Sequence, residues 1–125
     1  MSFTTCLNCI DGRAQLPVIY WIKENYGVDY VDMITEAGMD GKLAGDFNKY
    51  IDLMYDVIKI SVYTHKSDYV FIVGHHDCAG NPVDDATHKK QIILAAENLS
   101  KCALPVTVIG LWLSAEWVIE KIISK

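Results

Sequence analysis

Two short segments of this chain carry side chains of the kind that bind soft metal ions. Cys9 is followed by Asp11 and Arg13, and much further along the chain His75 is followed by Cys78. Two thiols and an imidazole form a ligand set typical of zinc, and three protein ligands leave a fourth coordination position open for chemistry. A carboxylate and a guanidinium placed two and four residues after Cys9 could orient the ligands by hydrogen bonds without binding the metal themselves. The sequence therefore predicts a zinc centre held by Cys9, His75 and Cys78.

The composition limits the class of protein that such a centre can belong to. The chain has 125 residues, of which 51% are hydrophobic, and a formal net charge of −5. These values are typical of a single globular domain, here residues 1–125. The charged residues form no basic cluster, which argues against a nucleic-acid partner. The longest apolar run, Val106–Leu113, is too short to span a membrane, so no membrane partner is expected.

The start of the chain bears on where the protein works. Residues 1–5 contain no basic stretch followed by an apolar one, so we expect no signal peptide and a cytoplasmic location. Thiols stay reduced in that compartment, which favours metal binding or redox chemistry over structural disulfides.

Apolar patterning predicts an alternation of strands and helices. Strands are expected at Phe3–Leu7, Tyr30–Thr35, Tyr69–Gly74 and Val106–Leu113. Helices are expected at Leu16–Tyr26, between Phe47 and Val62, from Asp84 or Asp85 to about Cys102, and after Ser114. The glycine-rich segment from Gly38 to Gly45 is expected to be a loop, and His88 is expected at the surface.

This alternation predicts the fold and the place of the site. It favours an α/β protein with three layers, α/β/α, around a mostly parallel four-stranded sheet. Cys9 follows the first strand, and His75 and Cys78 follow the third. In a sheet of order 2-1-3-4 these two strands are neighbours, and ligands bind at the crevice between the carboxyl ends of such strands. The topology thus predicts that the three ligands meet.

The same residues resemble the β-class carbonic anhydrases. That family carries a Cys-x-Asp-x-Arg element after its first strand and a Gly-His-x-x-Cys-Gly element after a later one. Cys9, Asp11 and Arg13 match the first element, and His75 and Cys78 match the second. The likeness runs from about residue 5 to the last strand, in the same order of elements.

Several features depart from the family pattern. An alanine, Ala79, stands where a glycine is usual, and only Ala37 and Gly38 match the family's Arg-Asn-Ala-Gly-Asn stretch. Typical members are longer, with an N-terminal helical arm and a substrate-contacting glutamine before the first cysteine. Only eight residues precede Cys9 here, so we expect a short variant without the arm and that glutamine.

The resemblance implies a function and a role for each site residue. It implies a zinc lyase that hydrates carbon dioxide to bicarbonate by a metal-bound hydroxide. Asp11 and Arg13 are then the catalytic pair: a bidentate contact with Arg13 keeps Asp11 off the metal, where it can accept a hydrogen bond from the hydroxide. The family builds its cleft near a subunit interface, which implies a homodimer or a larger homo-oligomer.

Other functions remain open from the sequence. The chain could be a non-catalytic zinc- or bicarbonate-binding protein of the same fold, or a hydrolase of a related molecule such as carbonyl sulfide. Cys6 and Cys9 form a C-x-x-C pair of the redox type. A low-molecular-weight phosphatase is excluded, because its Cys-x₅-Arg spacing is absent: six residues separate Cys6 from Arg13 and three separate Cys9 from Arg13.

Overall fold

The computed structural model describes residues 1–125 and arranges five strands in one sheet of order β2-β1-β3-β4-β5. The strands are β1 (Phe3–Asn8), β2 (Tyr30–Thr35), β3 (Tyr69–His75), β4 (Thr107–Leu113) and β5 (Ile119–Ser124). Strands β1 to β4 pair in parallel, whereas β5 runs antiparallel to β4. The predicted order 2-1-3-4 is confirmed, but the expected four-stranded sheet is wrong, because a fifth strand extends it.

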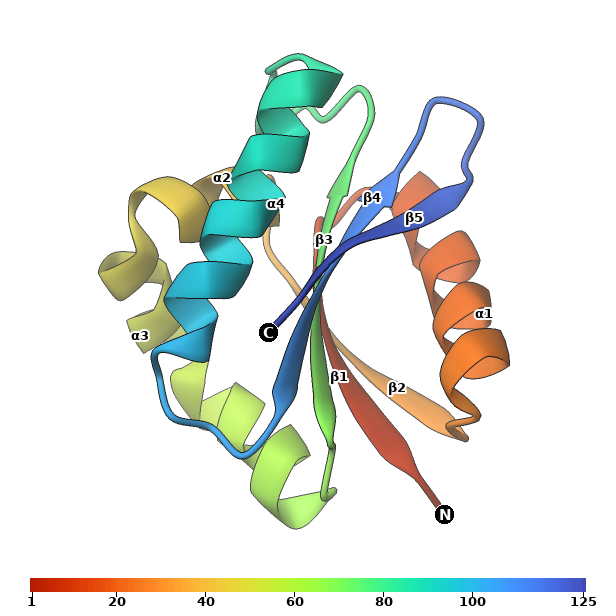
Figure 1. Ribbon diagram of the computed structural model, residues 1–125, viewed down its shortest axis with the longest axis vertical. Helices are drawn as coiled ribbons and strands as arrows, with labels where there is room; N and C mark the ends of the chain where they lie inside the picture. Colours follow the sequence, from red (N-terminus) through yellow and green to blue (C-terminus); the bar gives the residue numbers. More distant parts are fainter.

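Helices cover both faces of the sheet and make the three predicted layers. Helix α1 (Gln15–Tyr26) lies on one face, and α2 (Met39–Gly45), α3 (Phe47–Lys59) and α4 (Asp85–Ser100) lie on the other (Figure 1). A 3-10 turn, η1 (Gly12–Ala14), precedes α1, and a π-helical turn, η2 (Ile60–Thr64), follows α3. None of these helices combines the length and the apolar character needed to cross a membrane.

The helix expected after Ser114 is wrong, because this segment forms a turn and then β5. Its apolar residues, Trp117, Val118, Ile122 and Ile123, are spaced as on a helix, but a segment this short fits either structure. The strand is also irregular: Gly110 pairs with Ile123 and the next β4 residue, Leu111, pairs with Lys121. This bulge removes the strict alternation that would have indicated a strand in the sequence.

The glycine-rich segment expected as a loop contains helix α2. Met39 and Leu43, four residues apart, are both fully buried on one side of it. Gly41 permits a close approach, because a Cβ there would meet the side chain of Asn81. Glycine is therefore present for packing inside a helix and does not mark a loop at this position.

Two apolar clusters fill the spaces on either side of the sheet. The larger one joins β-strand residues to α2, α3 and α4. It includes Ile51, Met54, Ile58 and, in η2, Val62 from the predicted helix face, and Phe47 of that face packs against it. The other lies under α1, with Val18 and Ile22 against Phe71 and Leu111. The predicted cap of α4 is confirmed, since the carboxylate of Asp84 accepts a hydrogen bond from the backbone N–H of Thr87 at 2.7 Å.

Candidate metal centre

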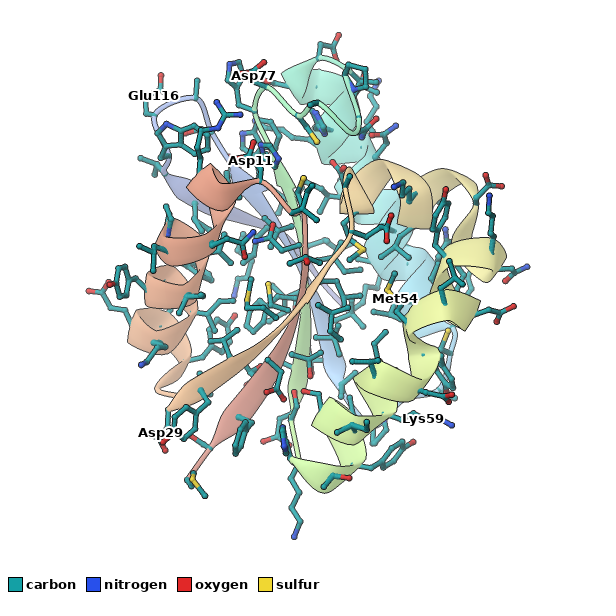
Figure 2. All side chains as sticks on the ribbon, turned by 180° about the vertical axis from the view of Figure 1, so that it is seen from behind. Asp11, Asp29, Met54, Lys59, Asp77 and Glu116 are labelled. Atoms are coloured by element: carbon teal, nitrogen blue, oxygen red, sulfur yellow. The ribbon has the colours of Figure 1, made fainter.

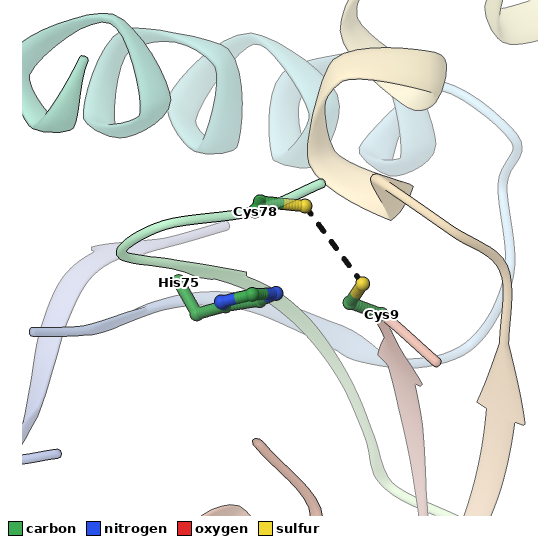
Figure 3. Close-up of side chains that lie close together, drawn as sticks. All are labelled: Cys9, His75 and Cys78. Carbon is green, nitrogen blue, oxygen red and sulfur yellow. Dashed lines mark hydrogen bonds between the residues drawn. The ribbon is translucent and has the colours of Figure 1, made fainter. Parts of the chain in front are cut away.

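The three predicted ligands converge at the carboxyl ends of β1 and β3. Cys9 lies directly after β1, His75 ends β3, and Cys78 lies in the turn that follows. Their ligand atoms all lie within 4.8 Å of one another, and the Sγ atoms of Cys9 and Cys78 are 3.8 Å apart. Figure 3 shows the three side chains pointing toward a common point. All three are buried, with at most 4% of each residue exposed.

The hydrogen bonding of His75 leaves one ring nitrogen free toward the thiols. Its Nδ1 lies 2.8 Å from the carbonyl oxygen of His76. A carbonyl can only accept, so Nδ1 carries the proton and Nε2 has an unprotonated lone pair. This Nε2 is buried and has no hydrogen-bond partner. A buried polar atom without a partner is costly, and a metal ion between Nε2 and the two thiols would remove that cost.

The separation of the two sulfur atoms fits a tetrahedral zinc ion. Bonds of about 2.3 Å to sulfur and about 2.0 Å to nitrogen place tetrahedral ligand atoms about 3.5–3.8 Å apart. The two sulfur atoms already have this separation. They are too far apart for a disulfide, whose S–S bond is about 2.05 Å, and both cysteines are free. The donor set of two thiols and one imidazole therefore suits zinc.

The thiol of Cys78 favours its neutral form when no cation is present. Burial raises the pKa of Cys78 to about 11, and the closeness of Cys9 adds to the effect. The backbone amides of Gly80 and Asn81 face this sulfur and act in the opposite direction. A divalent cation is what can hold both sulfurs as thiolates, so metal uptake must release protons.

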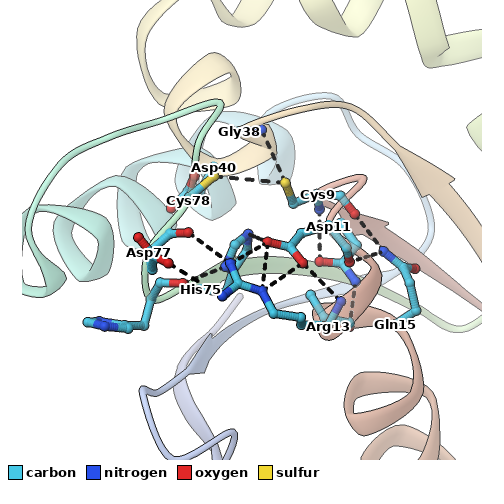
Figure 4. Close-up of polar contacts among 12 residues, drawn as sticks. Cys9, Asp11, Arg13, Gln15, Gly38, Asp40, His75, Asp77 and Cys78 are labelled. Atoms are coloured by element: carbon cyan, nitrogen blue, oxygen red, sulfur yellow. Dashed lines mark hydrogen bonds and ion pairs between the residues drawn. The ribbon is translucent and has the colours of Figure 1, made fainter.

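Asp11 and Arg13 form the predicted bidentate pair beside these ligands. The guanidinium Nη2 donates to Asp11 Oδ2 at 2.7 Å, and Nε donates to Oδ1 at 3.1 Å. The hydrogen bond from Arg13 lowers the pKa of Asp11 to about 2, so Asp11 accepts and does not donate at neutral pH. Asp11 Oδ2 lies 3.9 Å from His75 Nε2, next to the ligands and too far for a hydrogen bond. Figure 4 shows this pair among the surrounding contacts.

Two residues that sequence reasoning missed hold the Cys9 turn. The buried side chain of Asn8 accepts from the Cys9 backbone N–H at 2.8 Å and donates to the carbonyl of Ala14 at 3.0 Å. Gln15 donates to the carbonyl oxygens of Cys9 and Asp11, at 2.7 and 3.0 Å. Asn8 directly precedes Cys9 and Gln15 directly follows the η1 turn, and no spacing between them indicated this role in the sequence.

A buried polar network supports the second ligand loop. His88, expected at the surface, is fully buried, and its Nδ1 lies 2.6 Å from Asp40 Oδ2. The other Asp40 oxygen accepts from the side chain of Asn81 at 3.0 Å, and Asn81 also donates to Gln91 at 2.7 Å. Because Asn81 lies in the turn that carries Cys78, Asp40 ties this turn to α2 and α4. The expectation for His88 was wrong because the side of α4 that carries His88 packs against α2.

Close backbone approaches bring the loops together. A Cβ at Gly38 would meet the carbonyl oxygen of Gly80 at 2.5 Å, and a Cβ at Gly74 would collide with the Asp40 carboxylate. The backbone N–H of Gly38 also points at Cys9 Sγ, at 3.5 Å. The Gly38 position thus combines a left-handed φ of 64° with a contact to a candidate ligand, which explains a glycine there.

An open cleft of about 840 Å³ leads to Cys78. Its floor combines small apolar side chains, Ala79, Pro82, Val83 and Ala86, with the polar groups of Arg13, His76, Asp77, Asp84 and Asp85. His76 does not join the metal ligands. Its Nδ1 lies 2.8 Å from Asp85 Oδ1 on the rim of the cleft. A small neutral molecule can therefore reach the cluster over an apolar surface.

The redox alternative finds no support in the geometry. Cys6 is fully buried in the apolar cluster under α1. Burial raises the pKa of its thiol far above the usual value, whereas a redox cysteine needs a reactive thiolate. The Sγ atom of Cys9 instead contacts Cys78 and the backbone of Gly38, at the candidate metal centre. Cys6 is a core residue.

The fold and the site together define a carbonic-anhydrase-like α/β protein. Residues 1–123 match the family described as “Putative carbonic anhydrase”, and the chain belongs to that family. No curated protein matches its sequence.

Solved β-carbonic anhydrases have the same fold. Isoform I from Trichomonas vaginalis is 15% identical, with a TM-score of 0.62 over 95% of this chain and 81% of that chain. The enzyme from Streptococcus mutans is 11% identical, with a TM-score of 0.63 over 95% and 81%. Tetrameric β-carbonic anhydrases from Sordaria macrospora are 12% identical, with a TM-score of 0.56 over 100% and 83%. At these identities the likeness establishes the fold alone.

Proposed function

We propose that this protein is a zinc-dependent carbonic anhydrase that hydrates carbon dioxide to bicarbonate. The observation that carries the proposal is the buried convergence of Cys9, His75 and Cys78, with the free Nε2 of His75 facing two thiols. Cys9, His75 and Cys78 would hold the zinc ion. Zinc bound in this way supplies a water of lowered pKa at its open position, which can attack carbon dioxide near neutral pH.

The residues around the ligands have distinct parts in this chemistry. The carbonyl of His76 holds the proton on Nδ1 of His75 and so keeps the lone pair at Nε2. Asp11, ionised and held by Arg13, presents an acceptor oxygen beside the ligands and orients a donor there. The apolar side chains that line the cleft, among them Ala79 and Val83, are suited to admit a neutral substrate.

One observation favours a second function, the binding of zinc and bicarbonate without catalysis. Residues Thr4 to Asn8 of β1 are all buried in the sheet, and none lines the cleft. None of these five side chains therefore lies where it could contact a substrate as the family's glutamine does. A chain with this cleft could bind zinc and bicarbonate without turnover. The large open cleft also leaves room for a related substrate such as carbonyl sulfide.

Stopped-flow hydration of carbon dioxide by the zinc-loaded protein tests the proposal. We expect acceleration above buffer, and we expect Arg13→Ala to reduce it by roughly 10- to 100-fold while zinc stays near one per chain. The reason is that Asp11, once released, can occupy the open position. Lys59→Ala is the matched control, since it also removes the cation of an ion pair, with Asp56, at the far end of the molecule (Figure 2).

The outcomes separate the two functions. Equal turnover in Arg13→Ala and wild type contradicts the role of the Asp11–Arg13 pair. Wild-type protein that binds zinc but accelerates nothing supports the binding function, and a calorimetric titration with bicarbonate then tests that function directly.

We also propose a homodimer or larger homo-oligomer. A stripe of exposed apolar residues, Leu53, Val57 and Ile60, runs along the outer side of α3 and its extension. Such stripes are typical of interfaces, and the β-carbonic anhydrases of Sordaria macrospora with the same fold are tetramers. Light scattering at micromolar protein should give at least twice the 14.0 kDa chain mass. A stable monomer at that concentration contradicts this proposal.

A further inference from the structure

We infer that Trp117 is a positioning residue for Arg13, whose guanidinium it holds in the orientation that pairs with Asp11. The inference deepens the proposed function, because the Asp11–Arg13 pair stands beside the candidate metal ligands. Trp117 lies in the turn between β4 and β5, on a segment remote in sequence from both partners. Figure 2 shows Glu116, its neighbour in this turn, at the same end of the molecule as Asp11 and Asp77.

The guanidinium of Arg13 is enclosed by three groups from three segments. Its Cζ lies 4.9 Å from the centre of the Trp117 ring. Asp11 accepts from Nη2 and Nε, and the carbonyl oxygen of Asp77 accepts from Nη2 at 3.1 Å. The two acidic partners lie along the guanidinium edge, and the aromatic ring offers the electron-rich face that a cation prefers. The Arg13 side chain is 49% exposed, so the ring adds to these hydrogen bonds in holding it against turning toward water.

The backbone at Trp117 points to a role for its side chain. Trp117 has a φ of 60°, in the left-handed region that bulky residues rarely adopt. Its N–H donates to the carbonyl of Ser114 at 2.9 Å, and the Ser114 hydroxyl accepts from Val118, so the turn is closed by local bonds. Glycine would satisfy such a turn without strain. A tryptophan held there, partly buried against the cluster under α1, indicates that the ring is needed at this place.

The consequence for the candidate metal centre follows from one distance. Asp11 Oδ2 lies 3.9 Å from Nε2 of His75, so a small rotation would bring this carboxylate to the point where the ligands converge. Arg13 prevents that rotation by binding both carboxylate oxygens. By holding Arg13, Trp117 would keep Asp11 away from a metal held by Cys9, His75 and Cys78.

The first test uses metal-free protein and needs no activity. Hydrogen exchange of the Arg13 Nε–H is measured by NMR in wild type, Trp117→Leu and Trp117→Phe. Leucine keeps apolar bulk and must adopt the same left-handed φ, but it has no aromatic face. Phenylalanine keeps the aromatic face. We expect exchange roughly fivefold to tenfold faster in the leucine variant, and within about twofold of wild type in the phenylalanine variant, in line with a partly exposed cation–π contact.

Trp21 provides the matched control, because it is also partly buried and packs against Tyr26. Trp21→Phe should leave Arg13 exchange unchanged, and circular dichroism should show that every variant is folded. Equal exchange rates in Trp117→Leu and wild type overturn the inference. Equally fast exchange in the leucine and phenylalanine variants does so too, since the ring would then act through packing alone.

The second test uses bound cobalt as a spectroscopic probe of the candidate metal centre. Visible absorption of cobalt-loaded Trp117→Leu should differ from wild type, because Asp11 replaces the exchangeable ligand, while cobalt stays near one per chain. Trp117→Phe should retain the wild-type spectrum, and identical spectra for all three proteins contradict the inference. If wild type binds no cobalt, the proposed function fails, and the exchange measurement still decides whether Trp117 holds Arg13.

Discussion

Two buried histidines of this protein differ only in what surrounds them. His75 and His88 are 1% and 0% exposed, each has Nδ1 in a hydrogen bond, and each has an Nε2 with no partner. His75 bonds to a carbonyl oxygen, and its Nε2 faces the sulfur atoms of two cysteines. His88 bonds to the Asp40 carboxylate, and its ring lies 5.6 Å from that of Trp112.

The comparison shows that an unpartnered buried nitrogen is not enough to indicate a metal ligand. Soft donors converge on His75, whereas His88 has only an aromatic ring and a carboxylate near it. His75 is therefore a candidate metal ligand, whereas His88 supports the turn that carries Cys78. The two regions touch through Gly74, where a Cβ would collide with Asp40 directly before His75. The following predictions separate the two roles.

Zinc content should separate the two histidines most strongly. His75→Gln and Cys78→Ser should lose nearly all zinc, since a zinc site of this kind contributes about 10 kcal/mol or more of apparent binding free energy. His88→Gln and Cys6→Ser should keep about one zinc per chain. Elemental analysis after gel filtration gives the answer, and full retention in His75→Gln would falsify the ligand assignment.

Stability of the metal-free protein should rank the same histidines in the opposite order. His88→Gln should lower the free energy of unfolding by about 3 kcal/mol, because it leaves Oδ2 of the buried Asp40 carboxylate without its partner. His75→Gln should lower it by less, about 1 kcal/mol, because only the Nδ1 hydrogen bond to the His76 carbonyl is lost and Nε2 has no partner in the absence of metal. Urea unfolding with a chelator present measures both values. A larger loss for His75→Gln contradicts the division of roles.

Zinc affinity should depend on pH through the thiol of Cys78. Its pKa is raised to about 11 in the metal-free protein, so the thiol is protonated at neutral pH and must lose its proton when zinc binds. Affinity should therefore fall as the pH falls, about tenfold per pH unit for each proton released. Competition with a chelator between pH 6.5 and 8.5 measures the slope. His88→Gln should keep that slope, and a pH-independent affinity in wild type contradicts the prediction.

The sequence indicated the chemistry of the site better than the support around it. The spacing from Cys9 to Arg13 and from His75 to Cys78 is local, and its meaning does not depend on distant contacts. The supporting residues Asp40 and His88 are far apart in the chain and carry no shared pattern, so only packing of α2 against α4 reveals them as a pair.

Local patterns were also sufficient where an element has one buried face over several turns or a continuous apolar run. The apolar face of α3 and the buried strand β3 were predicted for this reason. Two short segments failed. Met39 and Leu43 make a helical face that the surrounding glycines obscured, and the segment after Ser114 has a bulge that gives it helical spacing.

The sequence by itself determined which side chains could bind a metal and at which edge of the sheet they would lie. It could do so because parallel strands with intervening helices bring their carboxyl ends to one edge, whatever the details of packing. The tertiary structure decided which buried groups pair and what holds Arg13. The pairing of Asp40 with His88 depends on the packing of α2 against α4. The hold on Arg13 depends on the edge of β4, where β5 pairs and its turn brings Trp117 over a guanidinium more than a hundred residues earlier in the chain.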